Sequence, residues 1–132
     1  MVSDSLDTCV ILSFILGQPV SQTKAVRKLL ESGSVHHISD LAISEVAYVL
    51  ECHYGHTHQE VAALIGLFLK NYDEVLNYNR ELFELVFPYY EEHPALSFND
   101  CCLAFYAELG HAEPLFTFDQ KLARQHPSAK ML

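Results

Sequence analysis

The stretch Leu6-Asp7-Thr8-Cys9-Val10-Ile11-Leu12 decides how the chain is interpreted. Residues 2–6 lead into it and are interpreted as a short strand. The apolar run from Val10 to Leu16 follows it, and a Gly and a Pro end that run, which is typical of a short helix. Asp7 therefore stands where the first strand passes into the first helix.

The same alternation of short apolar runs and helical periods continues along the chain. Further strands are predicted at 35–39, 74–77, 114–117 and 130–132. Helices are predicted at 21–30, 40–52, 57–70, 79–92, 97–109 and 119–125. In the helix 40–52, the apolar positions Leu41, Val46, Val49 and Leu50 are expected to face inward. Strands that alternate with helices favour an α/β domain with a mainly parallel sheet.

Length and composition predict a single domain over residues 1–132, because this length is sufficient to bury a core. No apolar run approaches the roughly 20 residues that span a bilayer. The N-terminus carries acids where a signal peptide has basic residues, so a cytoplasmic location is expected. The four cysteines form no C-x-x-C pair, which favours reduced thiols over a disulfide framework or a zinc site.

The formal net charge of −9 argues against a broad basic surface that grips nucleic acid. It is compatible with carboxylates gathered around a divalent cation, which then supplies local positive charge. Two basic clusters occur, Lys24 with Arg27 and Lys28, and Lys121 with Arg124. Either can meet RNA, but both are interpreted as solvated helix faces.

The histidines form no recognisable metal motif. His53, His56 and His58 lie close together and His36 and His37 are adjacent, but no H-E-x-x-H is present and Gly55 interrupts the helix. They are interpreted as residues of surface loops rather than zinc ligands. A G-x-G-x-x-G loop, a Walker A motif and a G-x-S-x-G element are also absent from the sequence, which argues against a nucleotide cofactor and a serine hydrolase.

Four acids stand at comparable positions in this pattern. Asp7 and Asp119 follow the first and fourth strands, Glu45 lies in the first turns of the helix after strand two, and Asp100 lies in the first turn of its helix. Strand ends and helix starts share one edge of a parallel sheet, where ligands bind. Clustered carboxylates without Arg or Lys bind protons or a cation, and oxygen ligands suit Mg²⁺ or Mn²⁺.

Each acid also has a structural interpretation that stays open. Asp7 and Asp119 can serve simply as helix N-caps. Asp100 can be the acidic partner of Ser97 in a capping box. Glu45 is acceptable as an early acid that faces the helix dipole.

The same four segments resemble the motifs of the PIN-domain family. LDTCVIL is similar to the opening D-[TS]-x-[VIL] motif, ISEVAYVLE to the second, LSFNDCCLAFYAELG to the third and PLFTFDQKLAR to the fourth, T-x-D-x-x-[LF]. Their order and spacing agree with the family over essentially the whole chain. The length is that of a stand-alone PIN domain of the VapC type, the toxin ribonuclease of type II toxin–antitoxin pairs.

The resemblance implies a three-layer α/β/α domain with a central, mainly parallel sheet of four to five strands. It implies an Mg²⁺- or Mn²⁺-dependent endoribonuclease in which metal-bound water attacks RNA and leaves a 5′-phosphate and a 3′-hydroxyl. Thr8 and Thr117 resemble residues that orient the carboxylates, although a hydroxyl that bonds to backbone is an equal alternative. By this resemblance, the catalytic residues and metal ligands are Asp7, Glu45, Asp100 and Asp119.

The resemblance also implies partners. A VapC-type toxin binds a cognate antitoxin whose tail occludes the acidic cleft, with an Arg or Lys on the carboxylates. A homodimer is implied as well, and the apolar helix around Val61 to Leu69 is a candidate interface or, equally, a helix buried within the monomer.

Two other classes of function were compared with the nuclease. A non-catalytic PIN-like module that acts by contact with a partner protein fits the acidity and the few basic residues. A phosphoryl-transfer fold of the haloacid-dehalogenase or receiver type also places an Asp after strand one. The first of these folds needs D-x-D there and the second needs an acidic pair, and neither pattern is present.

Overall fold

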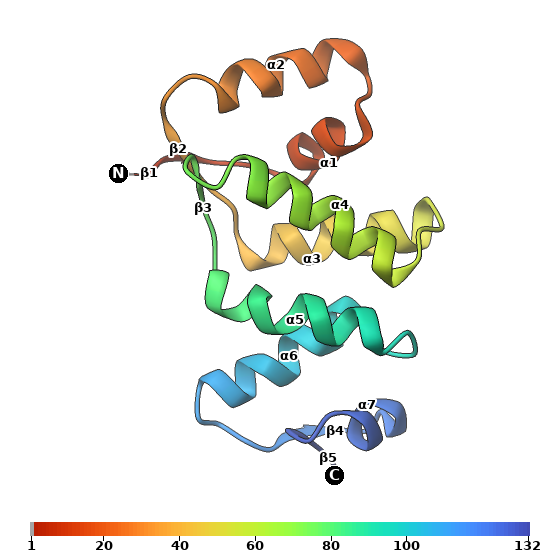
Figure 1. The fold of residues 1–132 in the computed structure, drawn as a ribbon. Coiled ribbons are helices and arrows are strands. Elements are labelled where there is room, and N and C mark those ends of the chain that lie inside the picture. Colours follow the sequence, from red (N-terminus) through yellow and green to blue (C-terminus); the bar gives the residue numbers. More distant parts are fainter. Residues whose placement is uncertain (1) are drawn as a thin grey trace. The chain divides into compact units, whose positions relative to one another are not determined.

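The structure is a computed structural model that describes residues 2–132 (Figure 1). Its contacts divide the chain into two compact units, an N-terminal unit that ends at Asn79 and a C-terminal unit of Arg80–Leu132. Each unit has its own helices and its own parallel strands, and each is described by itself below.

The N-terminal unit is built on a three-stranded parallel sheet in the order β1-β2-β3. Val2 pairs with Val35, and His36 pairs with Leu76. A π-helical turn, Val49–His53, directly follows α3. Its elements are β1 (Val2–Ser5), α1 (Thr8–Leu16), α2 (Val20–Leu30), β2 (Val35–His37), α3 (Asp40–Tyr48), α4 (His58–Asn71) and β3 (Leu76–Asn77).

Local sequence signals account for where these helices begin and end. Ser39 caps α3 by accepting the Ala42 N–H. Thr57 and Glu60 form the predicted capping box at the start of α4. Gly17 ends α1 in the left-handed region, at a φ of 70°, which glycine adopts without strain.

The core of the N-terminal unit lies among α1, α3 and α4. Ile11, Val46 and Ile65 are buried there, and Phe14 packs against Phe68. Most of the apolar stripe of α4 is buried within this unit, as one of the two alternatives for that helix predicted. The inward position expected for Leu41 is wrong, because its side chain is 76% exposed. The buried face begins one residue later and comprises Ala42, Ile43, Val46, Ala47 and Leu50.

The interpretation of the histidines as surface residues is wrong for His36 and His58. His36 is fully buried in β2, the middle strand of the sheet. Its Nδ1 lies 2.5 Å from Asp4 Oδ1, and its Nε2 lies 3.1 Å from the Leu29 carbonyl oxygen. His58 is buried at the start of α4. A histidine enters a core when neighbouring groups bond its ring nitrogens, and His36 has both partners.

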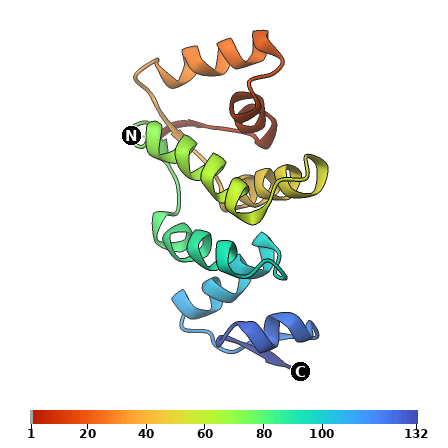
Figure 2. The same cartoon turned by 45° about the vertical axis from the view of Figure 1, so that its right-hand side comes forward.

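The C-terminal unit combines three helices with two parallel strands, β4 and β5 (Figure 2). Leu115 pairs with Ala129, and Thr117 pairs with Met131. Aromatic rings fill its core, where Phe98 stacks on Phe83 at 6.0 Å between centroids. Its elements are α5 (Arg80–Glu92), α6 (Phe98–Leu109), β4 (Leu115–Thr117), α7 (Gln120–Gln125) and β5 (Ala129–Met131).

The fold class predicted from the sequence is confirmed as a mixed α/β protein with parallel strands. Residues 2–132 contain seven α-helices and five strands, three in one sheet and two in another. One central sheet of four to five strands within a three-layer domain stays a prediction. In the same residues, no helix has the length and apolarity needed to cross a bilayer. Within the described residues none of the four cysteines forms a disulfide; Cys9 and Cys52 are exposed, and Cys101 and Cys102 are buried.

Candidate functional site

Asp7 lies at the N-cap of α1, two residues after β1 ends. Its Oδ1 accepts the Thr8 N–H at 2.7 Å, and the Cys9 thiol donates to Oδ2 at 3.7 Å. The side chain is exposed. The carboxylate is therefore held at the start of the helix while it stays accessible to a ligand.

Glu45 lies in the second turn of α3, the helix that follows β2. Its side chain is exposed, whereas the next two residues, Val46 and Ala47, are fully buried. The buried face of α3 thus fixes the helix in the N-terminal unit and directs Glu45 toward solvent. Helix α3 packs against α1, the helix that Asp7 caps.

Asp119 is the N-cap of α7, directly after β4 and Phe118. Its Oδ1 accepts the backbone N–H groups of Lys121 at 2.9 Å and Leu122 at 3.2 Å. The Thr117 hydroxyl oxygen accepts the Asp119 N–H at 2.9 Å. Thr117 therefore bonds to backbone, as one of its two alternatives predicted, and it fixes the residue that carries the carboxylate.

Asp100 lies in the first turn of α6 and is half-buried. Its N–H donates to the Ser97 hydroxyl at 3.0 Å, so Ser97 is the N-cap and Asp100 is the third residue after it. Burial, reinforced by the Asp100 charge, raises the pKa of the Cys101 thiol to about 12. The thiol beside Asp100 is thus neutral at physiological pH.

The structure places two of the four acids in each unit. Asp7 and Glu45 belong to the N-terminal unit, and Asp100 and Asp119 belong to the C-terminal unit. In residues 2–132, none of the four carboxylates is ion-paired with Lys or Arg. Over the same residues, no group of three or more His, Cys, Asp or Glu side chains forms a metal site. A shared site of all four acids stays a prediction.

The donor set nevertheless fits a hard divalent cation. All four groups are carboxylates, they lack basic partners among the described residues, and three of them are exposed. Oxygen ligands of this kind suit Mg²⁺ or Mn²⁺. The roles of Asp7 and Asp119 as helix caps are confirmed. Both use Oδ1 for the backbone, and Oδ2 of Asp7 also accepts the weak Cys9 thiol donor, so each Oδ2 retains lone-pair capacity for a ligand.

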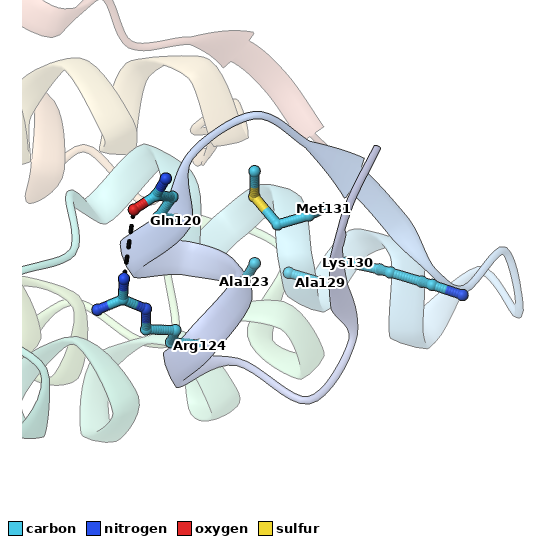
Figure 3. A pocket seen from close by; sticks show the side chains of 6 residues that line it. All are labelled: Gln120, Ala123, Arg124, Ala129, Lys130 and Met131. Atoms are coloured by element: carbon cyan, nitrogen blue, oxygen red, sulfur yellow. Dashed lines mark hydrogen bonds between the residues drawn. The ribbon is translucent and has the colours of Figure 1, made fainter.

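Lys130, which lies on β5, is not among the site residues that the sequence predicts. Together with α7 it lines an open hollow of about 460 Å³, shown in Figure 3. Arg124 lines the same hollow, and its guanidinium donates to Gln120 Oε1 at 3.2 Å. The parallel pairing of β5 with β4 brings Lys130 to this position, and a three-residue strand at the end of a chain gives only a weak sequence signal.

In this α/β protein, Asp7 and Asp119 cap the helices that follow two of the parallel strands, and both carboxylates are exposed. The family model described as PIN domain matches residues 5–126, so nearly the whole chain and all four acids lie within the match. The chain belongs to the PIN-domain family, whose members are typically nucleases and commonly use divalent metals. A comparison with curated proteins returned no match.

Proposed function

We propose that this protein is an Mg²⁺- or Mn²⁺-dependent endoribonuclease that hydrolyses RNA phosphodiesters at Asp7, Glu45, Asp100 and Asp119. The observation that carries the proposal is the position of these acids. Asp7 and Asp119 cap the helices after β1 and β4, Asp100 is in the first turn of α6, and Glu45 is in the second turn of α3. Membership of a nuclease family supports the class of reaction.

The chain's own residues would hold the ion and keep its ligands in place. The carboxylates supply oxygen ligands and negative charge, and the caps fix Asp7 and Asp119 at the helix starts. A bound divalent ion supplies an activated water and stabilises the leaving oxygen of the phosphodiester. Thr117 acts as a positioning residue, because its hydroxyl oxygen holds the Asp119 backbone.

The test is RNA cleavage with Mg²⁺, with Mn²⁺ and with EDTA, on a mixed pool of structured RNAs. Asp100→Asn and Glu45→Gln remove one charge each and keep the side-chain shape. We expect each to reduce cleavage by more than the roughly 10- to 100-fold loss typical of residues that only support a metal ligand. Glu84→Gln, an exposed position on α5, is the matched control and should retain activity.

The outcomes separate catalysis from a role in binding alone. Cleavage that needs metal and is lost in Asp100→Asn supports the proposal. Equal cleavage by Asp100→Asn and the native protein contradicts the assignment of the site. Absence of cleavage together with absence of Mn²⁺ binding in calorimetry would favour the PIN-like module that acts by contact with a partner protein.

We further propose that the protein is the cytoplasmic toxin of a toxin–antitoxin pair and forms a homodimer. The four unpaired carboxylates support an antitoxin whose Arg or Lys pairs with them. Induced expression should arrest bacterial growth, and the Asp100→Asn variant should not. Growth arrest by both proteins would contradict a toxic effect through this site.

A further inference from the structure

His36 is a buried bridge between β1 and α2. Its side chain has no exposed area, and it lies on β2, the middle strand of the N-terminal sheet (Figure 1). Nε2 lies 3.1 Å from the Leu29 carbonyl oxygen in α2, and Nδ1 lies 2.5 Å from Asp4 Oδ1 on β1. A carbonyl oxygen only accepts, so Nε2 carries a proton, and a second proton lies between Nδ1 and Asp4. The ring therefore ties two other elements to β2.

The pairing of β1 with β2 contains a shift of register. Val2 pairs with Val35, and the next pair is Asp4 with His36, so β1 advances by two residues where β2 advances by one. A continuous register begun at Val2 would pair Asp4 with His37 instead. That arrangement would leave Nδ1 of a fully buried ring without its partner, which is unfavourable. The bond between Asp4 and His36 thus selects the observed register over the continuous one.

The register of β1 determines where Asp7 leaves the sheet. Ser5 pairs with His37, and the Leu6 N–H donates to the His37 carbonyl oxygen at 2.9 Å. Leu6 is buried, and Asp7 follows it directly as the N-cap of α1. A slip of one residue moves a strand by roughly 3.3 Å, which exceeds the roughly 2.1 Å of a bond between Mg²⁺ and oxygen. A carboxylate displaced by that distance cannot remain a ligand of the same ion.

We infer that Asp4 and His36 form a positioning pair for Asp7, an inference that rests on the proposed function. Neither residue is one of the four proposed ligands, and both act through the backbone of residues 4–7. The pair holds β1 in one register on β2, so that Asp7 reaches the start of α1 at the position where it can bind a metal ion. The same bond accounts for an acid within β1, because strands are depleted in Asp.

The test measures Mn²⁺ binding by calorimetry and, in metal-free protein, backbone amide exchange by NMR. Asp4→Ala removes the bond to His36. We expect it to weaken Mn²⁺ binding by roughly 10- to 100-fold, the loss typical of residues that support a metal ligand. The N–H groups of Leu6 and Thr8 bond to His37 and Asp7, and both should exchange faster than in the native protein.

Two variants separate positioning from a contribution to stability alone. Asp4→Asn keeps a side-chain N–H that can donate to Nδ1 of a neutral His36, so it should bind Mn²⁺ with near-native affinity. The double variant Asp4→Ala/His36→Phe leaves no ring nitrogen buried without a partner, so it should be at least as resistant to urea as Asp4→Ala. Its Mn²⁺ affinity should nevertheless stay low, because the bond between the two strands is absent.

Thr57→Ala is the matched control in the same unit. It removes the capping box of α4 and lowers stability, but it keeps the bond between Asp4 and His36. Its Mn²⁺ affinity and the exchange of the Leu6 amide should therefore be native. Asp7→Asn gives the loss of affinity expected when a proposed ligand itself changes. Circular dichroism checks that each variant is folded.

The failures of the two proposals are distinguishable because amide exchange needs no metal. RNA cleavage by a native protein whose Asp4→Ala variant binds Mn²⁺ with native affinity overturns this inference and leaves the nuclease intact. Equal losses in Asp4→Ala and Thr57→Ala overturn it, as does recovery of Mn²⁺ binding in the double variant or its loss in Asp4→Asn. Faster exchange confined to residues 6–8 of Asp4→Ala, in a protein that binds no Mn²⁺ and cleaves no RNA, supports the positioning of Asp7 and overturns the nuclease.

Discussion

Asp7 in the N-terminal unit and Asp119 in the C-terminal unit follow parallel strands and cap helices, but their bonds differ. Asp119 Oδ1 accepts two N–H groups, from the second and third residues of α7. Asp7 Oδ1 accepts the N–H of Thr8, the first residue of α1. The bonds of Asp119 are those of a full N-cap, and those of Asp7 are not. Helix capping therefore explains the acid at position 119 better than the acid at position 7.

The largest expected effect is a loss of RNA cleavage that is the same at both positions, although their capping bonds differ. Asp7→Asn and Asp119→Asn each keep a side-chain oxygen that accepts the capping bonds but lose the charge that a metal ion needs. We expect both variants to lose RNA cleavage to a similar extent, by more than the roughly 10- to 100-fold of a supporting residue, with little change in the free energy of unfolding. Single-turnover cleavage and urea unfolding measure the two quantities.

Loss of cleavage in only one of these two variants would show that Asp7 and Asp119 do not have equivalent roles in catalysis. Full activity of Asp7→Asn would leave position 7 without a catalytic role and would contradict the assignment of the four acids to one site. Glu84→Gln again serves as the charge-matched control.

The second effect sharpens the difference between the two acids. Asp119→Ala removes a cap with two bonds and should lower the free energy of unfolding by about 1 kcal/mol relative to Asp119→Asn. Asp7→Ala should cost about 0.5 kcal/mol or less relative to Asp7→Asn, the low end for a cap. Urea unfolding followed by circular dichroism is suitable because the chain has no tryptophan. Equal losses of unfolding free energy in Asp7→Ala and Asp119→Ala would show that the number of capping hydrogen bonds does not determine the stabilisation.

The same acids show how much of the fold could be predicted from the sequence. Caps, the Thr57–Glu60 capping box and the strand-to-helix alternation are local signals, and the structure confirms them. The π-helical turn Val49–His53 was not predicted, because its hydrogen bonds give no regular apolar period. The burial of His36 was missed because it depends on Asp4 of another strand, which is distant in sequence, and on a backbone carbonyl of the preceding helix.

For the candidate site, too, the features that depend on neighbouring residues could be predicted, and those that depend on distant residues could not. The place of each acid on its own strand end or helix start could be predicted, since it depends on a few neighbouring residues. A meeting of Asp7 with Asp119 depends on which strands pair, and the pairings among the described residues are β1 with β2, β2 with β3 and β4 with β5. Local patterns do not encode strand order, so the four-acid site stays a prediction that the activity of the variants must test.

The smallest expected effect contrasts two of the buried histidines, His36 in the N-terminal unit and His126 in the C-terminal unit. Both ring nitrogens of His36 have partners. His126 Nδ1 accepts the Ser128 N–H at 3.1 Å, so Nε2 carries the proton of the neutral ring. Within residues 2–132 that buried Nε2 has no hydrogen-bond partner. Protonation of His126 would place a second proton on Nδ1, against the Ser128 N–H.

Burial lowers the pKa of His126 below its ordinary value of 6.5, and His93 lowers it further, whereas Glu108 and Glu113 oppose the shift. The unfolded chain therefore binds more protons than the folded one as the pH falls below about 6.5. The stabilising contribution of the neutral ring is present above that pH and is lost as the pH falls toward the folded-state pKa. The C-terminal unit should thus lose stability on mild acidification.

His126→Phe tests this contribution, since a phenyl ring can keep the packing against Tyr89 and Phe105, whose rings lie 4.7 Å away. The free energy of unfolding of this variant should fall less between pH 7.5 and pH 5.5 than that of the native protein. His53→Gln, at an exposed histidine of the N-terminal unit, should keep the native pH dependence. The same dependence in His126→Phe and the native protein would assign the acid sensitivity to other groups and would remove the contrast between His36 and His126.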